Sequence, residues 1–163
     1  EPFVAGLFKQ QEAFIGDKQH VVKMKVRNVE MRKEPEFDAS VEYSCKTKTA
    51  VVLGENTDDA KHEQYIIPVS PSYADLMKNS MIDKCKSVGM GSVSPEDIQF
   101  EVKQVKTKPV LQAIKAGTDE ETKVKAYHYE FKLKAPPEVM KLLYATGIGS
   151  MNSLGFGMWE VKK

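Results

Sequence analysis

Hydrophobic and polar residues alternate with a period of two in several short segments of the chain. This pattern is typical of a strand that buries one face and exposes the other. Glycine, proline and acidic residues separate the segments and predict turns between them. The extended segments are residues 20–32, 40–53, 62–69, 97–106, 123–134 and 154–163. The second and third of these predict a hairpin over residues 41–69.

Residues 70–89 carry their hydrophobic positions at helical spacing instead, and they predict the clearest helix of the chain. Ser72 and Asp75 have the spacing of a capping box at its start. Its hydrophobic stripe consists of Tyr73, Leu76, Met77, Met81 and Cys85. We therefore expect this helix to bury that stripe against a sheet.

Residues 135–147 predict a second helix, with Pro137 at its first position and Gly147 as its C-terminal cap. Residues 3–13 predict the end of a further helix. From residue 37 onward the elements follow the order βαββαβ, with one additional strand after the first. This order predicts an α+β fold, a ferredoxin-like (RRM-like) sandwich with two helices on one face of an antiparallel four-stranded sheet.

The segment 123–134 contains an aromatic row in which Tyr127, Tyr129 and Phe131 share one face. A sheet must bury one face, so we expect this row to lie in the core. His128 falls on the opposite face and is expected to be a plain surface or edge histidine.

Composition narrows the range of functions. The chain has 163 residues, of which 41% are hydrophobic and 29% charged, as in ordinary globular proteins, and no apolar run approaches the roughly 20 residues that cross a bilayer. Cys45 and Cys85 lie far apart without a CxxC partner, so we expect buried, reduced thiols. The three histidines lack metal-ligand spacing, and no metal or cofactor is expected. The net charge of +1 neither indicates nor excludes nucleic-acid binding, because that binding depends on a local basic patch rather than on the charge of the whole chain.

Four of the ten glycines lie within residues 147–157, directly before the last strand. The dinucleotide fingerprint GxGxxG fails because Asn152 stands at its third glycine, and no lysine follows as a P-loop requires. A helix precedes the loop and a strand follows it, so the helix N-terminus that usually binds phosphate is absent. Two interpretations stay open: the glycines allow capping and close packing, or successive amides form an anion-binding nest for a polyanion such as RNA.

Basic residues occur in several groups along the predicted elements. Lys46 and Lys48 point the same way on one strand, Lys84 and Lys86 end the first helix, and further basic residues alternate along segment 20–32. Each group alone is most simply a solvated surface. If several groups meet beside the glycine-rich loop, they favour the binding of a polyanion.

Residues 147–161, GIGSMNSLGFGMWEV, resemble the glycine-rich signature of the RAMP superfamily. Within it the chain most resembles the CRISPR-associated endoribonucleases that process repeat RNA, whose chains close with G-x-G, a small polar stretch, GFG and a hydrophobic strand. The similarity extends over residues 37–163. It implies that this part is the C-terminal one of two tandem ferredoxin-like domains, with residues 1–36 as the last helix and strand of a truncated N-terminal domain. That the chain begins with Glu1 rather than Met fits this expectation.

The resemblance implies cleavage of precursor CRISPR repeat RNA without a metal ion. In that chemistry the 2′-hydroxyl attacks the adjacent phosphate and leaves a 2′,3′-cyclic phosphate, and a histidine acts as general acid and base. In most relatives this histidine lies early in the N-terminal domain. His20, His62 and His128 match no such position, so the catalytic residues are unknown and we expect the chain alone not to cut RNA.

The resemblance also implies the partners, which are CRISPR repeat RNA or crRNA and other CRISPR-associated subunits, in the cytoplasm of a prokaryote and without a membrane. A homodimer stays open. The expected RNA contacts are Gly147, Gly149, Ser150, Asn152, Gly155, Gly157, Lys46 and Lys48. Two alternatives stay open: a non-catalytic RAMP scaffold subunit of an RNA-guided complex, or a small-ligand-binding ferredoxin-like module. RNA binding would weaken steeply with salt, whereas a small ligand need not.

Overall fold

A computed structural model describes residues 12–16, 21–25, 27–28, 33–55, 64–106 and 108–162. Its contacts divide the chain into two compact units, Glu1–Glu34 and Pro35–Lys163. None of the helices in the described ranges has the length and apolar character that a membrane span requires.

In the first unit, β1 (Glu12–Gly16) and β2 (Val21–Lys25) form an antiparallel pair. This confirms a strand within the predicted segment 20–32. The helix predicted for residues 3–13 lies mostly outside the described residues, and the part that is described belongs to β1. Lys23 pairs with Glu12, with 2.8 Å between Nζ and Oε2.

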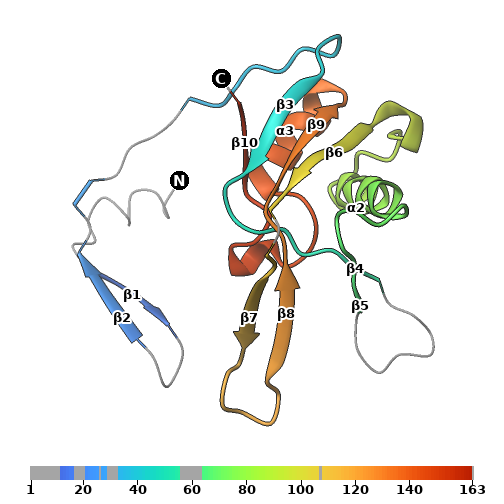
Figure 1. Ribbon diagram of the computed structural model, residues 1–163. Helices are drawn as coiled ribbons and strands as arrows, with labels where there is room; N and C mark the ends of the chain where they lie inside the picture. The colour runs from blue at the N-terminus through green and yellow to red at the C-terminus, as the bar shows by residue number, and fades with distance from the viewer. Residues whose placement is uncertain are drawn as a thin grey trace. The chain divides into compact units, whose positions relative to one another are not determined.

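The second unit is built on a four-stranded antiparallel sheet with the strand order β10-β3-β9-β6 (Figure 1). Its strands are β3 (Tyr43–Thr47), β6 (Gln99–Val105), β9 (Tyr129–Lys134) and β10 (Trp159–Val161). The first and third strands in chain order lie at the centre of the sheet, and a helix follows each of them. The predicted ferredoxin-like α+β fold is therefore confirmed.

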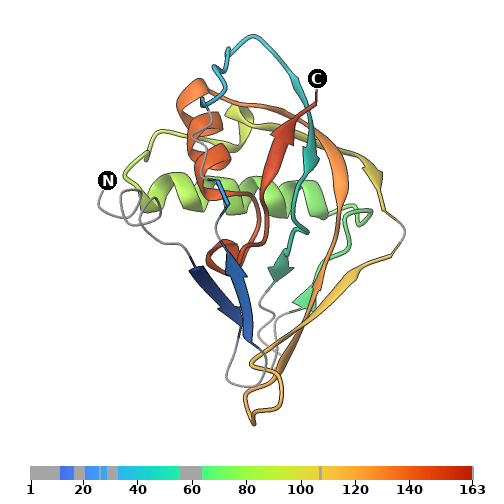
Figure 2. The same cartoon turned by 90° about the vertical axis from the view of Figure 1, so that its left-hand side faces the viewer.

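The two helices, α2 (Tyr73–Ser87) and α3 (Pro137–Thr146), contact each other and pack on the same face of this sheet (Figures 1 and 2). The predicted positions Pro137 and Gly147 are confirmed, because α3 begins at the proline and the glycine N–H donates to the Leu143 carbonyl at 2.9 Å. A short 3-10 helix, Pro95–Asp97, leads into β6.

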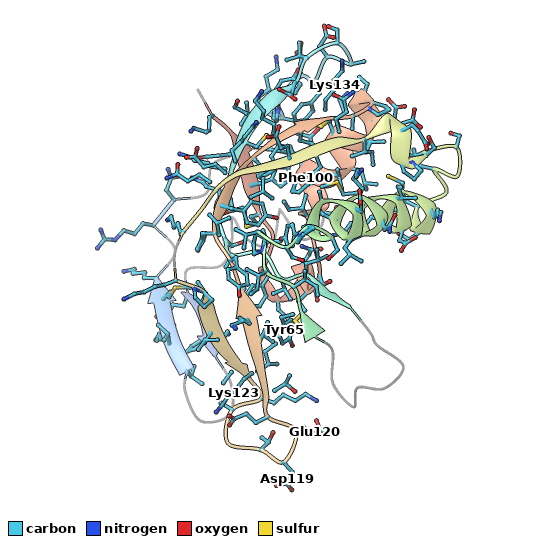
Figure 3. All side chains as sticks on the ribbon, turned by 45° about the vertical axis from the view of Figure 1, so that its right-hand side comes forward. Tyr65, Phe100, Asp119, Glu120, Lys123 and Lys134 are labelled. Carbon is cyan, nitrogen blue, oxygen red and sulfur yellow. The ribbon has the colours of Figure 1, made fainter. Side chains whose placement is uncertain are left out.

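One hydrophobic core fills the space between the helices and the sheet. Alternate residues of β9 are buried in it, which confirms the aromatic row expected to face inward. Phe100 of β6, labelled in Figure 3, lies in the same core. The predicted hydrophobic stripe of α2 is buried at Tyr73, Met77, Met81 and Cys85 and partly buried at Leu76.

The capping box predicted for α2 is wrong. Ser72 has a right-handed helical backbone, with φ −78° and ψ −12°, and its side chain caps no helix N–H. A capping serine needs an extended backbone to reach back to the first turn, and this backbone cannot supply it. Asp75 pairs instead with Lys78 at 2.8 Å.

Segment 123–134 is not one strand but two, which corrects the prediction. The ladder pairing of β9 with β6 ends at Tyr129, and Tyr127 forms an isolated bridge with Val51. On one side of this break lies β9; on the other, β8 (Thr122–Ala126) pairs with β7 (Val110–Ile114), a strand that the sequence pattern did not predict. Figure 3 shows Asp119 and Glu120 at the tip of this projecting hairpin and Lys123 along it.

The hairpin predicted over residues 41–69 is also mostly wrong. Only β4 (Gly54–Glu55) and β5 (Gln64–Tyr65) pair with each other, while β3 pairs with β9 and β10. Strand β3 lies inside the sheet, between β10 and β9. Because these two strands satisfy its backbone groups, it needs no hairpin partner next to it in the sequence. The predicted last strand begins at Trp159 rather than at residue 154.

Candidate functional site

The glycine-rich loop, residues 147–158, connects α3 to β10 and is hydrogen-bonded to the rest of the domain along its length. Its two ends are joined, because the Ile148 N–H donates to the Gly157 carbonyl at 2.9 Å. The Ser150 and Gly157 N–H groups donate to the carbonyls of Val52 and Ala50 at 2.8 and 2.9 Å. The loop is therefore a fixed part of the fold rather than a free connection.

All four glycines of the loop have positive φ, between 71° and 89°. Three of them also lack room for a side chain: a Cβ at Gly147 would lie 2.8 Å from Asn152 Nδ2, one at Gly149 2.8 Å from Val51 Cγ1, and one at Gly157 would overlap the Ile148 carbonyl. Gly155 differs, since it is exposed and a Cβ there would have no neighbour within 4 Å. The close-packing interpretation thus holds for three glycines, and Gly155 is the one open to an incoming ligand.

Asn152 holds the loop in shape from inside. Its Nδ2 donates to the carbonyls of Ile148 and Phe156 at 3.1 and 2.9 Å, and its Oδ1 accepts a hydrogen bond from the Lys84 ammonium. Lys84 Nζ also donates to the Gly147 carbonyl at 3.0 Å. The polar atoms of the Asn152 side chain are therefore engaged within the domain, so this residue would affect an RNA contact through the loop conformation.

Lys84 comes from the last turn of α2, and its ammonium group binds the loop directly. Burial lowers the pKa of its ammonium below the ordinary value. Beside it a shallow groove runs between α2 and the loop, lined by the polar side chains of Asn79, Ser80, Ser87 and Ser150. Asp83 also lines this groove, and its carboxylate lies 3.4 Å from Lys86 Nζ. The groove thus offers hydroxyl and amide groups, which can donate or accept hydrogen bonds, beside one partly buried cation.

The backbone of the loop changes hand at Met151, which has φ 57° and ψ 31°, before a short 3-10 helix, Asn152–Leu154. Such a change from left- to right-handed residues turns successive N–H groups toward one side, the geometry of an anion-binding nest. Within the described part of the chain, the N–H groups of residues 151–153 have no hydrogen-bond acceptor.

Lys46 and Lys48 point the same way, as predicted, because both ammonium groups lie 3.0 Å from the carboxylate of Glu160 on β10. Hydrogen bonds from Lys46 and then Lys48 hold the pKa of Glu160 below its ordinary value. The Lys48 N–H donates to the Met158 carbonyl at 2.7 Å, so these lysines adjoin the end of the loop. They reach it already paired with a carboxylate. Their contact with RNA, like that of the loop residues, stays a prediction.

The expected buried thiols are confirmed, since Cys45 and Cys85 are buried and free, and burial raises the pKa of Cys45 to about 12. His20 and His62 lie outside the described residues. His128 is neither a plain surface nor an edge residue: it is half-buried directly before the central strand β9, and its Nδ1 lies 3.1 Å from Thr47 Oγ1. In the ranges that the structure covers, no three His, Cys, Asp or Glu side chains gather as metal ligands would.

Sequence reasoning did not identify Lys84 as the anchor of the loop or His128 as part of a hydrogen-bonded pair. The sequence placed Lys84 at the end of the first helix, but its partner Asn152 lies 68 residues further along the chain. Only the tertiary fold brings such residues together.

Comparison with known proteins agrees with this geometry. Residues 31–161 match the family model described as CRISPR associated protein Cas6, C-terminal. The chain is 27% identical, over 167 aligned residues, to the CRISPR-associated endoribonuclease Cas6 of Pyrococcus furiosus. That alignment covers 99% of this chain and 56% of the relative.

Solved structures show the same fold at low sequence identity. A Cas6-related protein from Pyrococcus furiosus superposes with a TM-score of 0.76 at 22% identity, covering 98% of this chain and 61% of that one. A structure titled "CRISPR associated protein Cas6" gives 0.71 at 23% identity, with coverage of 99% and 62%. One titled "An RAMP protein binding different RNA substrates" gives 0.74 at 20% identity, with coverage of 98% and 62%.

The chain therefore spans about 56–62% of the length of these relatives. The family model accounts for both helices, the four-stranded sheet and the glycine-rich loop. The chain belongs to the Cas6 family of CRISPR-associated proteins, and the matched part is the family's C-terminal domain.

Proposed function

We propose that this chain binds CRISPR repeat RNA through its glycine-rich loop and the adjoining groove, as part of a protein that processes precursor repeat RNA. The observation that carries the proposal is the loop itself. Its amides at residues 151–153 have no acceptor among the described residues, and they lie beside the partly buried ammonium group of Lys84. Amides and ammonium groups are the donors that bind phosphate oxygens in RNA complexes.

The accessible part of the loop agrees with this proposal. Gly155 and Ser153 are exposed, and Ser150 lines the groove with its hydroxyl group. A backbone without side chains lets a sugar-phosphate chain approach closely, and short hydroxyl side chains can bond phosphates and 2′-hydroxyls. The endoribonuclease and the RNA-binding RAMP protein among the relatives support RNA as the ligand.

The test is fluorescence anisotropy with labelled single-stranded CRISPR repeat RNA at several salt concentrations. We expect log K to fall linearly with log salt, with a slope of roughly −0.7 for each phosphate contacted. A scrambled RNA of equal length measures the nonspecific part. Absent binding, or binding that does not respond to salt, would refute the proposal.

We further propose that the parent protein cleaves the repeat by 2′-hydroxyl attack without a metal ion, with catalytic residues that this chain does not supply. Within the described residues His128 is the one histidine, and its Nδ1 is engaged by Thr47. Incubation of the chain with repeat RNA in EDTA should leave the RNA intact. Specific cleavage ending in a 2′,3′-cyclic phosphate would show that the catalytic residues are in this chain after all.

A further inference from the structure

A second donor-rich site lies on the face of the sheet that the helices do not cover. Lys46, Glu130 and Gln104 stand side by side on β3, β9 and β6, as their strand register shows. Their sequence neighbours Cys45 and Phe131 are buried in the core, so these three face the other way. Here the structure forms a small cavity, the His128 hollow, whose lining includes Lys46, Thr47, Gln104, Lys106, His128 and Glu130.

The hydrogen bonds of His128 determine what the ring presents to this hollow. The Thr47 hydroxyl oxygen accepts the Tyr129 N–H at 3.2 Å and lies 3.1 Å from His128 Nδ1. The hydroxyl proton can be donated to Nδ1, and in that arrangement neutral imidazole carries its ring proton on Nε2. Burial first, and the charge of Lys106 second, lower the pKa of His128. With that tautomer the ring offers its Nε2–H as a donor, and the described residues provide no partner for Nε2.

Positive charge exceeds negative charge around the hollow. The carboxylate of Glu130 is bound by Lys162 at 2.6 Å, and that of Glu160 is shared by Lys46 and its neighbour Lys48. Lys106 is exposed, and no carboxylate within the described ranges pairs with it. Four ammonium groups thus accompany two carboxylates, so an anion would meet an excess of positive charge.

The size of the hollow limits what can occupy it. Its volume is about 170 Å³, below the roughly 300 Å³ at which pockets for whole small molecules begin. One anionic group fits this space better than a complete nucleotide does.

We propose that the His128 hollow binds a single phosphodiester group of the RNA strand, with Lys106 as its counter-charge and His128 Nε2 and the Gln104 amide as hydrogen-bond donors. This inference rests on the proposed RNA-binding function. The hollow is joined to the glycine-rich loop through β3. Lys48, directly after Thr47, donates its N–H to the carbonyl of Met158, which follows Gly157 in the loop. A strand of RNA bound at the loop can continue along β3 to the hollow.

The test compares the variants Lys106→Ala and Lys134→Ala in the same anisotropy assay. Lys134 lies on β9, on the same face as Glu130, but it does not line the hollow. We expect Lys106→Ala to weaken RNA binding about three- to tenfold at 0.1 M salt and to reduce the salt slope by about 0.7, as for one lost phosphate contact. Lys134→Ala should leave the slope unchanged. If the unaltered chain binds RNA and Lys106→Ala has the same affinity and slope, the inference is wrong while the proposed function stands. If the unaltered chain binds no RNA, the proposed function fails first.

Proton NMR of the histidine rings provides a second readout that is specific to the hollow. The chain has three histidines, and His128→Gln identifies the signal of His128. We expect RNA to shift this signal and inorganic phosphate at equal phosphate concentration to leave it in place. A shift by inorganic phosphate that also displaces RNA would assign the hollow to a free anion and overturn the inference.

Discussion

Replacing Gly157 with alanine would place a methyl group closer than 3.0 Å to both the Ile148 carbonyl oxygen and the Asn152 side-chain amide. Real Cβ atoms do not tolerate such a separation, so the loop must shift. The affected atoms are those that join the two ends of the loop, including the Ile148 N–H bond to the Gly157 carbonyl at 2.9 Å. The same position has φ 81°, a backbone conformation that disfavours any side chain.

Two costs add up at this position. A left-handed backbone costs a residue other than glycine about 1–2 kcal/mol. Overpacking in a closely packed region costs about 1–3 kcal/mol more. The sum is about 2–5 kcal/mol, a large part of the roughly 5–15 kcal/mol by which domains are stable. Gly155→Ala is the matched control, because its φ of 89° carries the first cost but open space around it removes the second.

Urea unfolding followed by the fluorescence of Trp159 measures both variants. This is the single tryptophan of the chain; it is 4% exposed and directly follows the loop in β10. We expect Gly157→Ala to lower the unfolding free energy by at least about 1 kcal/mol more than Gly155→Ala, with equal m-values. If the two variants differ by less than about 0.5 kcal/mol, the steric argument is wrong.

Three further predictions concern the anchor, the exposed glycine and the buried thiol. Lys84→Met leaves the Gly147 carbonyl and Asn152 Oδ1 without their donor, and it should cost about 1–3 kcal/mol in urea unfolding; an unchanged midpoint would refute the anchoring role. Gly155→Ala should keep most of the stability but weaken RNA binding severalfold in the anisotropy assay, since its methyl group projects into open space; equal affinity would exclude a close approach of RNA there. The pKa of Cys45 is raised to about 12 in the fold, so the native state keeps its proton while the unfolded state loses it near pH 9, and stability falls as pH rises. Between pH 9 and 10 the unfolding free energy should fall by about 1 kcal/mol more than in Cys45→Ala; parallel pH profiles would contradict this.

The pattern of hydrophobic residues predicted best those elements that bury one side in the core, because their hydrophobic residues then recur at regular intervals. Helix α2 buries a regular set of positions and was located correctly, and the inward-facing row of β9 was predicted although the strand begins only at Tyr129. Strand β7 was missed because Val110–Ile114 is mostly exposed or half-buried and is held chiefly by pairing with β8. Val110 and Ile114 pack against a small second cluster that includes Val124 and Ala126. A strand that buries little leaves little trace in the order of hydrophobic residues.

The site was predictable only where it depends on neighbours in sequence. The cap at Gly147 follows from the helix that precedes it, and it was predicted. The bond between Lys84 and Asn152 and the pair formed by Thr47 and His128 join residues 68 and 81 positions apart. The spacing of residues along the chain does not predict such distant pairs, because they depend on the order of the strands in the sheet.

The glycine-rich loop is closed by hydrogen bonds to Ala50, Val52 and Leu143 and to the Lys84 side chain, which come from three separate parts of the domain. The loop can therefore acquire its shape only in the folded domain, and a ligand that recognises this shape binds the native state alone. Such a ligand acts as a stabiliser: RNA at 100 times its Kd would add about 2.7 kcal/mol to the unfolding free energy. Occupancy by RNA would consequently protect the domain from unfolding and from the proteolysis that follows it.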